Sequence, residues 1–334
     1  MELKAIRVSS DADVDLCEVD LPATPAGTLL LKTHYVGICG TDLGFITKQR
    51  KPIKTNPLTL GHEIVSSIYS LNDSTNINLK VGDRVTVQLM AGCERCSDCL
   101  SDYKLGCISG ERIGITVNGG YAEYVSVPIA NVCKLPYNVS FEQGVFADPL
   151  SCAYKAIQKI IGRTYKNVLI FGGGVIGIFC LQLLRHYSIA QNITIFDRHV
   201  ERLQVASEWD TINVSNDYVM PDRYFDLVIE ASGSTELFLQ GIKSLKSRGT
   251  ILLIGLHQNR EIPINTFELL QKDCAIIASL AYGKKDMEAS LDLLSQRRIS
   301  VDKLSTKIFP LSSFKDAFES AIHKRVMKVI FSTF

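Results

Sequence analysis

The 334-residue sequence lacks several features that would define its class at once. It has no long run of Lys and Arg and a formal net charge of only +1, which excludes a basic stripe for nucleic acid or for an anionic membrane. The first twenty residues lack the apolar core of a signal peptide, and three consecutive glycines interrupt the most apolar window, residues 168–186. We therefore expect a cytoplasmic protein with a small-molecule partner, no nucleic acid and no membrane.

Two patterns of apolar residues divide the chain, and 46% hydrophobic residues over this length allow more than one core. Residues 1–150 contain short Val, Ile, Leu and Thr runs separated by Gly, Pro, Asn and Asp, which is typical of an irregular, mostly β domain. From about residue 165, short apolar runs alternate with helix-length segments, which predicts a doubly wound parallel sheet. After residue 283, two helical patterns precede a last apolar strand, and this tail could belong to either domain.

A dinucleotide site is predicted at "NVLIFGGGVIGIFCLQLLRH", where Gly172, Gly174 and Gly177 have the G-x-G-x-x-G spacing. The first glycine permits a tight turn, the second lets backbone N–H groups approach a pyrophosphate, and the third lets helix pack on strand. Asp197 ends the next strand, where a carboxylate binds ribose hydroxyls and repels a 2′-phosphate, so NAD is preferred to NADP. Arg198 follows it and would favour NADP. The candidate cofactor-binding residues are Gly172, Gly174, Val175, Ile176, Gly177, Asp197, Arg198 and Arg202.

Four of the ten cysteines lie close together as C-x2-C-x2-C-x7-C. Thiols stay reduced in the cytoplasm, so metal ligation is favoured over disulfides. A short polar loop can present four thiolates to one structural zinc ion, while an iron–sulfur cluster and chance clustering are the alternatives. The predicted ligands are Cys93, Cys96, Cys99 and Cys107.

A second set of metal-binding residue types lies in the first domain. Cys39 sits in "VGICGTD", His62 and Glu63 in "LGHEIV", and Asp148 in "FADPLSCAY". Three protein ligands with one open position make a catalytic zinc site, where the metal lowers the pKa of an alcohol.

The order of several motifs resembles that of a known family. "GICGTD", "GHE", the four cysteines, "GGYAEY", "ADPLSCAYKA", "VLIFGGGVIG" and "IEASGS" together resemble the zinc-dependent medium-chain dehydrogenase/reductases, in particular the polyol branch of sorbitol, galactitol-phosphate and threonine dehydrogenases. The resemblance implies a GroES-like catalytic domain (1–150), a Rossmann NAD-binding domain (151–285) and a return to the catalytic domain (286–334). It also implies two zinc ions per chain.

The resemblance further implies roles for single residues. Cys39 and His62 would bind the catalytic zinc, with Glu63 as third ligand or Asp148 in its place, directly or through water. Asp42 would fix the His62 tautomer, and Thr41 would take the substrate proton. The candidate catalytic residues are Thr41, Glu63 and Asp148.

The sequence also departs from its relatives. Gly44 stands where many carry a proton-relaying histidine, Met90 replaces a histidine of threonine dehydrogenases, and Ala281 with Tyr282 replaces an Arg-Tyr pair of sorbitol dehydrogenases. Asp148 is a Glu in most relatives, and the shorter side chain makes ligation through water more plausible. Threonine and sorbitol are therefore disfavoured as substrates.

These observations predict an oxidoreductase that reversibly oxidises a secondary alcohol of a polyol or sugar-like compound with NAD. A polyol-phosphate dehydrogenase is one alternative, and a non-catalytic NAD-binding protein is another of a different class. The apolar strand "CAIIASL" (274–280) suggests an edge that a second subunit covers, as in a homodimer or homotetramer.

Overall fold

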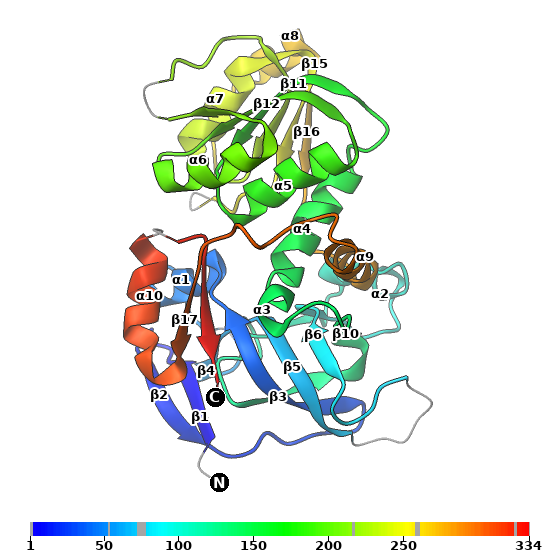
Figure 1. Cartoon of the computed structure of the whole chain (residues 1–334), viewed down its shortest axis with the longest axis vertical. Coiled ribbons are helices and arrows are strands. Elements are labelled where there is room, and N and C mark those ends of the chain that lie inside the picture. The colour runs from blue at the N-terminus through cyan, green and yellow to red at the C-terminus, as the bar shows by residue number, and fades with distance from the viewer. Residues whose placement is uncertain are drawn as a thin grey trace. The chain divides into compact units, whose positions relative to one another are not determined.

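The computed structural model describes residues 3–52, 54–71, 78–215, 218–257, 261–323 and 326–333. The chain divides into two compact units, one formed by Met1–Ser151 with Ala281–Phe334 and the other by Cys152–Leu280. We call them the β-rich unit and the inserted unit (Figure 1). No helix in the described ranges is both long and apolar enough to cross a bilayer.

Within the residues that the structure describes, the β-rich unit contains three sheets. A seven-stranded sheet runs in the order β10-β6-β5-β3-β18-β17, with β9 also paired to β3; β2-β1-β4 form a second sheet and β7-β8 a third. Its strands are β1 (Leu3–Val8), β2 (Val14–Val19), β3 (Thr28–Gly37), β4 (Leu58–Thr59), β5 (Glu63–Leu71), β6 (Arg84–Val87), β7 (Met90–Ala91), β8 (Glu111–Arg112), β9 (Tyr124–Pro128), β10 (Val132–Lys134), β17 (Thr306–Pro310) and β18 (Lys328–Ser332).

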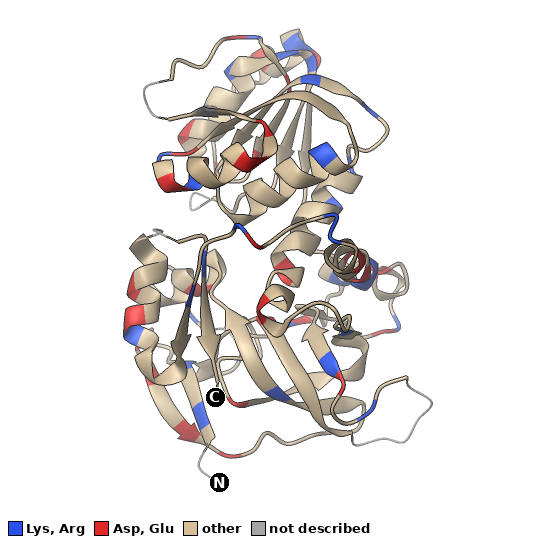
Figure 2. Cartoon of the chain, viewed as in Figure 1, with Lys and Arg blue, Asp and Glu red and all other residues tan. Residues whose placement is uncertain are grey.

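Helices connect these strands, and Figure 2 shows charged residues of both signs on α9 (Lys284–Ser295) and α10 (Phe314–His323). The α-helices are α1 (Gly40–Ile46), α2 (Ser97–Leu100), α3 (Phe141–Gly144), α9 (Lys284–Ser295) and α10 (Phe314–His323). The 3-10 turns are η1 (Lys104–Gly106), η2 (Ile129–Asn131) and η4 (Leu311–Ser313). Helix α4 (Ala147–Gln158) begins in the β-rich unit and continues into the inserted unit.

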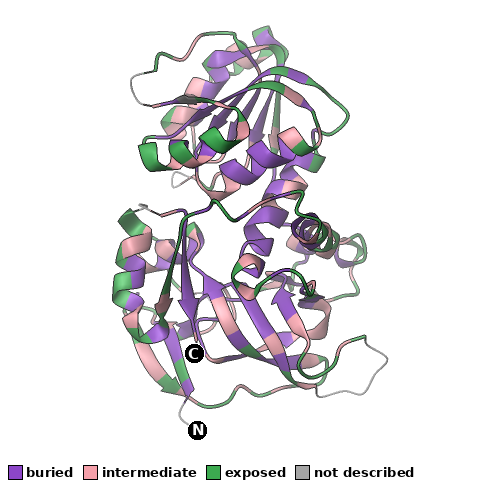
Figure 3. Ribbon diagram, in the orientation of Figure 1, coloured by how far each residue is buried: buried purple, intermediate pink, exposed green. Residues whose placement is uncertain are grey.

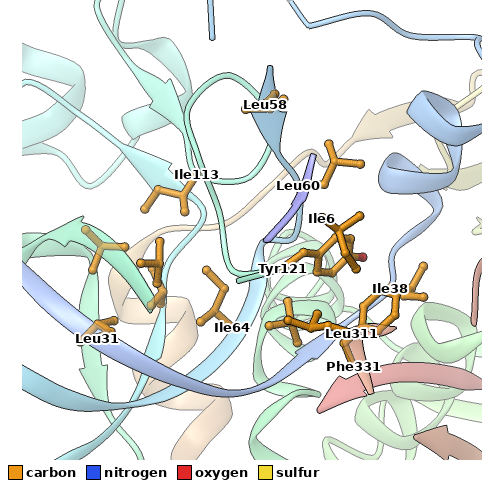
Figure 4. Packing of buried hydrophobic residues seen from close by; sticks show 14 of the residues in the cluster. Ile6, Leu31, Ile38, Leu58, Leu60, Ile64, Ile113, Tyr121, Leu311 and Phe331 are labelled. Atoms are coloured by element: carbon orange, nitrogen blue, oxygen red, sulfur yellow. The ribbon is translucent and has the colours of Figure 1, made fainter. Parts of the chain in front are cut away.

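Tyr121 lies in the core of the β-rich unit, among aliphatic and aromatic side chains from strands far apart in sequence (Figure 4). Its ring packs edge-on against Phe331 of β18 at 4.9 Å, and its hydroxyl donates to Asp42 Oδ2 at 2.9 Å. Gly61 has a φ of +93°, and a Cβ there would lie 2.4 Å from the Tyr121 ring. Glycine is thus needed at this position, directly before His62.

The inserted unit is a six-stranded sheet in the order β13-β12-β11-β14-β15-β16, with every pair parallel. Figure 3 shows its central strands as buried, as expected for strands covered on both faces. The strands are β11 (Tyr165–Phe171), β12 (Ala190–Phe196), β13 (Ile212–Val214), β14 (Phe225–Glu230), β15 (Leu245–Leu253) and β16 (Ala275–Ala278). The helices are α5 (Val175–His186), α6 (Val200–Ala206), α7 (Thr235–Ser244) and α8 (Thr266–Lys272), with the 3-10 turn η3 (Ser207–Trp209).

The strand order reverses between β11 and β14, and ligands of such sheets bind beyond the carboxyl ends of the strands at that point. The predicted fold class, a mostly β GroES-like domain with an inserted doubly wound parallel sheet, is confirmed.

Candidate active site

Strand pairing brings together Cys39, His62 and Glu63. Cys39 follows β3 and precedes α1, while Glu63 begins β5 and pairs in register with Gly37. One ligand atom from each of the three side chains lies within 4.8 Å of the other two. Gly37 makes room for this arrangement, because a Cβ there would lie 1.9 Å from Glu63 Oε2.

Asp42 contacts two members of this cluster, Cys39 and His62. Its carboxylate is fully buried and accepts hydrogen bonds from the Cys39 backbone N–H at 2.8 Å and from Tyr121. Its Oδ1 lies 3.5 Å from His62 Nδ1, which leaves Nε2 as the nitrogen available to a metal. Burial lowers the pKa of His62, but Asp42 and Cys39 together raise that pKa well above its ordinary value, so the surroundings stabilise positive charge.

The charge of Glu63 is met by Lys328 of β18, whose ammonium contacts Glu63 Oε2. Both side chains are buried. A thiolate, an imidazole and a carboxylate that converge on one point are a donor set suited to a catalytic zinc ion with an open position. The residues therefore fit the metal that the sequence predicts.

Asp148 lies outside this three-residue cluster. It occupies the first turn of α4 and accepts a hydrogen bond from the Tyr282 hydroxyl at Oδ2. Burial raises the pKa of Asp148 to about 6, and the nearby Glu63 adds to the rise while His62 opposes it. The sequence marked Tyr282 only as part of a difference from sorbitol dehydrogenases, and no local signal linked it to a residue as distant in the chain as Asp148.

Thr41 is buried in the first turn of α1, two residues after Cys39. Gly44, where relatives carry the relay histidine, is also buried, and a Cβ there would lie 3.0 Å from the Arg50 side chain. Thr41 is thus buried in the helix turn that follows the candidate ligand Cys39. The aliphatic part of the Arg50 side chain lies beside Gly44, where many relatives carry the histidine.

The four remaining predicted thiols also converge. The sulfur atoms of Cys93, Cys96, Cys99 and Cys107 lie within 4.8 Å of one another, and all four cysteines are free. We call residues 93–107 the cysteine lobe. Backbone N–H groups of Arg95 and Cys96 lower the pKa of Cys93 to about 6, which favours the thiolate that binds metal. Four sulfur donors fit a closed structural zinc site.

The glycine turn has the geometry that the G-x-G-x-x-G pattern predicts. Gly172 has a φ of +101°, and Gly174 caps the N-terminus of α5. A Cβ at Gly177 would lie only 1.8 Å from the Gly172 carbonyl oxygen, so helix and turn are packed against each other here. Val175 and Ile176 are half-buried in the first turn of α5.

Asp197 reaches back to this turn. Its Oδ2 accepts a hydrogen bond from the Gly173 N–H at 2.8 Å, and its Oδ1 accepts one from the His199 N–H at 2.8 Å. Arg202 Nη1 lies 3.6 Å from Asp197 Oδ2, whereas Arg198 donates to the His199 ring on the exposed side. The turn, Asp197 and Arg202 form one cradle suited to an adenosine ribose and pyrophosphate.

Glu230 is a further residue of the cofactor region that sequence reasoning did not identify. It ends β14 opposite Phe171, is fully buried, and accepts hydrogen bonds at Oε1 from the N–H groups of Ser232 and Gly233 at 2.8 and 2.9 Å. Its Oε2 lies 3.1 Å from His257 Nε2. Glu230 therefore fixes the loops after β14 and β15 where the strand order reverses, although "IEASGS" alone gave it no role.

Comparison with known proteins agrees with this arrangement. An alcohol dehydrogenase GroES-like domain matches residues 25–137, and a glucose dehydrogenase C-terminus matches residues 141–331, more than half of the chain. D-arabinitol dehydrogenase 1 of Uromyces fabae is 26% identical over 98% of this chain and 96% of its own length. D-arabitol-phosphate dehydrogenase of Enterococcus avium is 26% identical over 94% and 92%.

A solved structure, described as a zinc-binding dehydrogenase of Sinorhizobium meliloti 1021 bound to NADP, superimposes with a TM-score of 0.88 at 26% identity and covers 99% of both chains. The chain belongs to the zinc-dependent medium-chain dehydrogenase/reductase family. The family predicted from the order of its motifs is thereby confirmed.

Proposed function

We propose that this protein is a zinc-dependent oxidoreductase that reversibly oxidises a secondary alcohol of a polyol or sugar-like substrate with NAD. The observation that carries the proposal is the convergence of Cys39, His62 and Glu63 beside a buried Asp148. The polyol relatives support the substrate class.

The bound zinc ion would supply Lewis-acid polarisation of the substrate oxygen, and the nicotinamide would supply the hydride acceptor. Cys39, His62 and Glu63 would hold the ion, with Glu63 rather than Asp148 as third ligand because only Glu63 lies in the cluster. Asp42 keeps the His62 ring oriented, and Lys328 balances the charge of Glu63. Thr41 would accept the alcohol proton while its own hydroxyl proton passes on to water, so that it relays one proton as the hydride leaves. Asp148, held by Tyr282, would orient a substrate hydroxyl or a water molecule.

The preference for NAD rests on Asp197. Its buried carboxylate borders the glycine turn, where it would repel the extra phosphate of NADP. The cysteine lobe would hold a second, structural zinc ion, giving two per chain.

Phosphorylated polyols are the second candidate substrates. The observation in their favour is the similarity to D-arabitol-phosphate dehydrogenase over nearly the whole chain.

We also propose a homodimer or homotetramer. β16 lies at one edge of the six-stranded sheet, and Ile276 on this strand is 38% exposed. An apolar strand edge of this kind is suited to pairing with a second copy.

The proposal is tested by a metal count on purified protein together with NAD reduction across polyols, sugars and polyol phosphates. We expect two zinc ions per chain and turnover on at least one polyol or polyol phosphate. Cys39→Ala is expected to lose one zinc ion and turnover but to keep its affinity for NADH. Cys17 lies outside both groups of candidate metal ligands, so Cys17→Ala is expected to keep its zinc content and its turnover. If the wild-type protein bound zinc in the cysteine lobe alone and showed no turnover, the proposed oxidoreductase function would be wrong.

A further inference from the structure

Tyr282 is held at both ends. Its side chain is buried, its hydroxyl donates to Asp148 Oδ2, and the Leu89 N–H lies 3.4 Å from the same hydroxyl. The Gln88 side-chain amide donates to the Tyr282 carbonyl oxygen at 3.2 Å. The preceding Ala281 has a φ of +51°, which alanine disfavours, so surrounding contacts must hold this segment in place.

The segment continues into α9, whose first N–H groups have no partners within the helix. Gly283 is the residue before the helix and offers no side-chain oxygen. Asp102 of the cysteine lobe supplies the acceptors instead: its Oδ1 accepts from the Lys284 N–H at 3.0 Å and its Oδ2 from the Lys285 N–H at 3.1 Å. The carboxylate also suits the positive end of the helix dipole.

This contact is closely fitted on both sides. Asp102 has a φ of +59°, and its own N–H donates to the Cys99 carbonyl oxygen at 3.1 Å. A Cβ at Gly283 would lie 2.4 Å from Asp102 Oδ2, so a larger residue there would displace the carboxylate.

A second contact ties the same segment to the N-terminal part of the β-rich unit. Lys284 Nζ donates to the Ala130 carbonyl oxygen at 3.2 Å. The neighbouring Asn131 is fully buried, and its side chain donates to the carbonyl oxygens of Gln88 and Met90 at 2.7 and 2.8 Å. Hydrogen bonds thus hold Tyr282 itself and the residues that follow it, Lys284 and Lys285.

We infer that the cysteine lobe positions the active-site residue Tyr282: Asp102 holds the first turn of α9, and the short link through Gly283 fixes the tyrosine that orients Asp148. This inference rests on the proposed function, in which Asp148 orients the substrate. Tyr282 and Asp102 are positioning residues. The lobe metal would then influence catalysis through this contact and not only through stability.

The first test measures amide hydrogen exchange, which needs no substrate. Asp102→Ala should raise exchange at Lys284 and Lys285 by roughly tenfold, because their acceptors are lost. Cys96→Ser should raise exchange at the same amides, because the lobe loses a metal ligand. Asp98→Ala, which removes a carboxylate from the same lobe without a contact to α9 in the described structure, is the matched control and should leave exchange there unchanged. Unchanged exchange in Asp102→Ala or in Cys96→Ser would overturn the inference.

The second test is a double-mutant cycle on activity. Asp102→Ala should lower kcat/KM for the best alcohol roughly five- to tenfold and leave the NADH dissociation constant unchanged. Tyr282→Phe should lower kcat/KM at least as much, and adding Asp102→Ala to it should change kcat/KM less than about twofold. Multiplicative effects of the two substitutions would refute the positioning role.

A variant that keeps the side-chain size guards against misfolding. Asp102→Asn retains one oxygen acceptor and should show an intermediate effect in both tests, and it replaces Asp102→Ala if that protein does not fold. If exchange changes as expected but the wild type oxidises no alcohol, the contact between lobe and α9 stands and the proposed function fails.

Discussion

In the glycine turn, we predict that one glycine substitution mainly lowers stability and that another mainly weakens cofactor binding. A Cβ at Gly177 would lie 1.8 Å from the Gly172 carbonyl oxygen, against about 3.0 Å for the closest real contacts, so α5 must move away from the turn by more than 1 Å. A Cβ at Gly174 would meet nothing nearer than Arg202 Nη1 at 3.6 Å, and the φ of Gly174, −74°, suits alanine. Two glycines of one motif should therefore respond differently to the same substitution.

Gly177→Ala is expected to destabilise the inserted unit by about 3 kcal/mol, because the crowding is against backbone that cannot rotate away. For a unit of this size, that loss lowers the Tm by about 10 °C. Gly174→Ala is expected to lower the Tm by no more than about 3 °C, since alanine costs roughly 0.5–1 kcal/mol more than glycine at a helix N-cap. It should nevertheless weaken NADH binding roughly tenfold or more, because the methyl group occupies the space that a pyrophosphate needs.

Differential scanning calorimetry and a fluorescence titration with NADH measure the two effects. Gly241→Ala, within α7, is the control for a helix glycine whose Cβ would meet side chains, Val228 at 3.0 Å and Phe171 at 3.3 Å, and no backbone. If Gly174→Ala bound NADH as tightly as the wild type, the pyrophosphate could not lie against this turn. A Gly177→Ala protein with an unchanged Tm would show that the packing argument is wrong.

Three further predictions concern single side chains. Asp197→Ser should shift the ratio of the kcat/KM values for NAD and NADP about 100-fold toward NADP. The repulsion between two unit charges about 5 Å apart is about 3 kcal/mol at an effective dielectric constant of 20. Steady-state kinetics with both coenzymes measure this ratio, and an unchanged ratio would count against the role of Asp197. Cys107→Ser should remove one zinc ion per chain and lower the Tm, as a metal count and calorimetry would show, whereas retention of both ions would contradict a four-sulfur site. Lys272→Met should lower the free energy of unfolding by about 2 kcal/mol in urea titrations, because the fully buried Lys272 Nζ donates to the Ile242 and Lys243 carbonyl oxygens. Lys243→Met, at an exposed side chain, is the control. Equal losses of unfolding free energy in the two variants would contradict this reasoning.

The features that could be predicted from the sequence are those encoded by short spacings. The cysteine lobe and the glycine turn each lie within twenty residues, so the distance along the chain limits the distance in space. Cys39 and His62 are further apart in the chain, and they were predicted as ligands of one metal because the order of the motifs around them resembles that of a known family. The alternation of apolar runs was sufficient to predict the parallel sheet.

The remaining features depend on contacts that no local pattern records. Tyr282 meets Asp148, Lys284 meets Asp102, and Lys328 meets Glu63 only because residues 281–334 return to the β-rich unit. Which carboxylate joins the metal cluster depends on the register between β3 and β5, which places Glu63 opposite Gly37. The resemblance predicted that the C-terminal segment returns to the first domain, but the sequence alone gives neither the strand register nor the side-chain contacts of that segment.

The position of β18 determines the order in which the protein can fold during synthesis. This strand lies between β3 and β17 inside the seven-stranded sheet, and Thr333 donates its N–H to His34. The β-rich unit therefore cannot complete its main sheet until the ribosome has translated residue 332, whereas the contiguous inserted unit can fold as soon as residue 280 has emerged. Nascent-chain folding usually proceeds from the N-terminal domain onward. Here the middle of the chain would fold first. Until β18 is synthesised, residues 35–37 of β3 would lack this partner strand and stay open to chaperones, whereas residues 28–32 can already pair with β9.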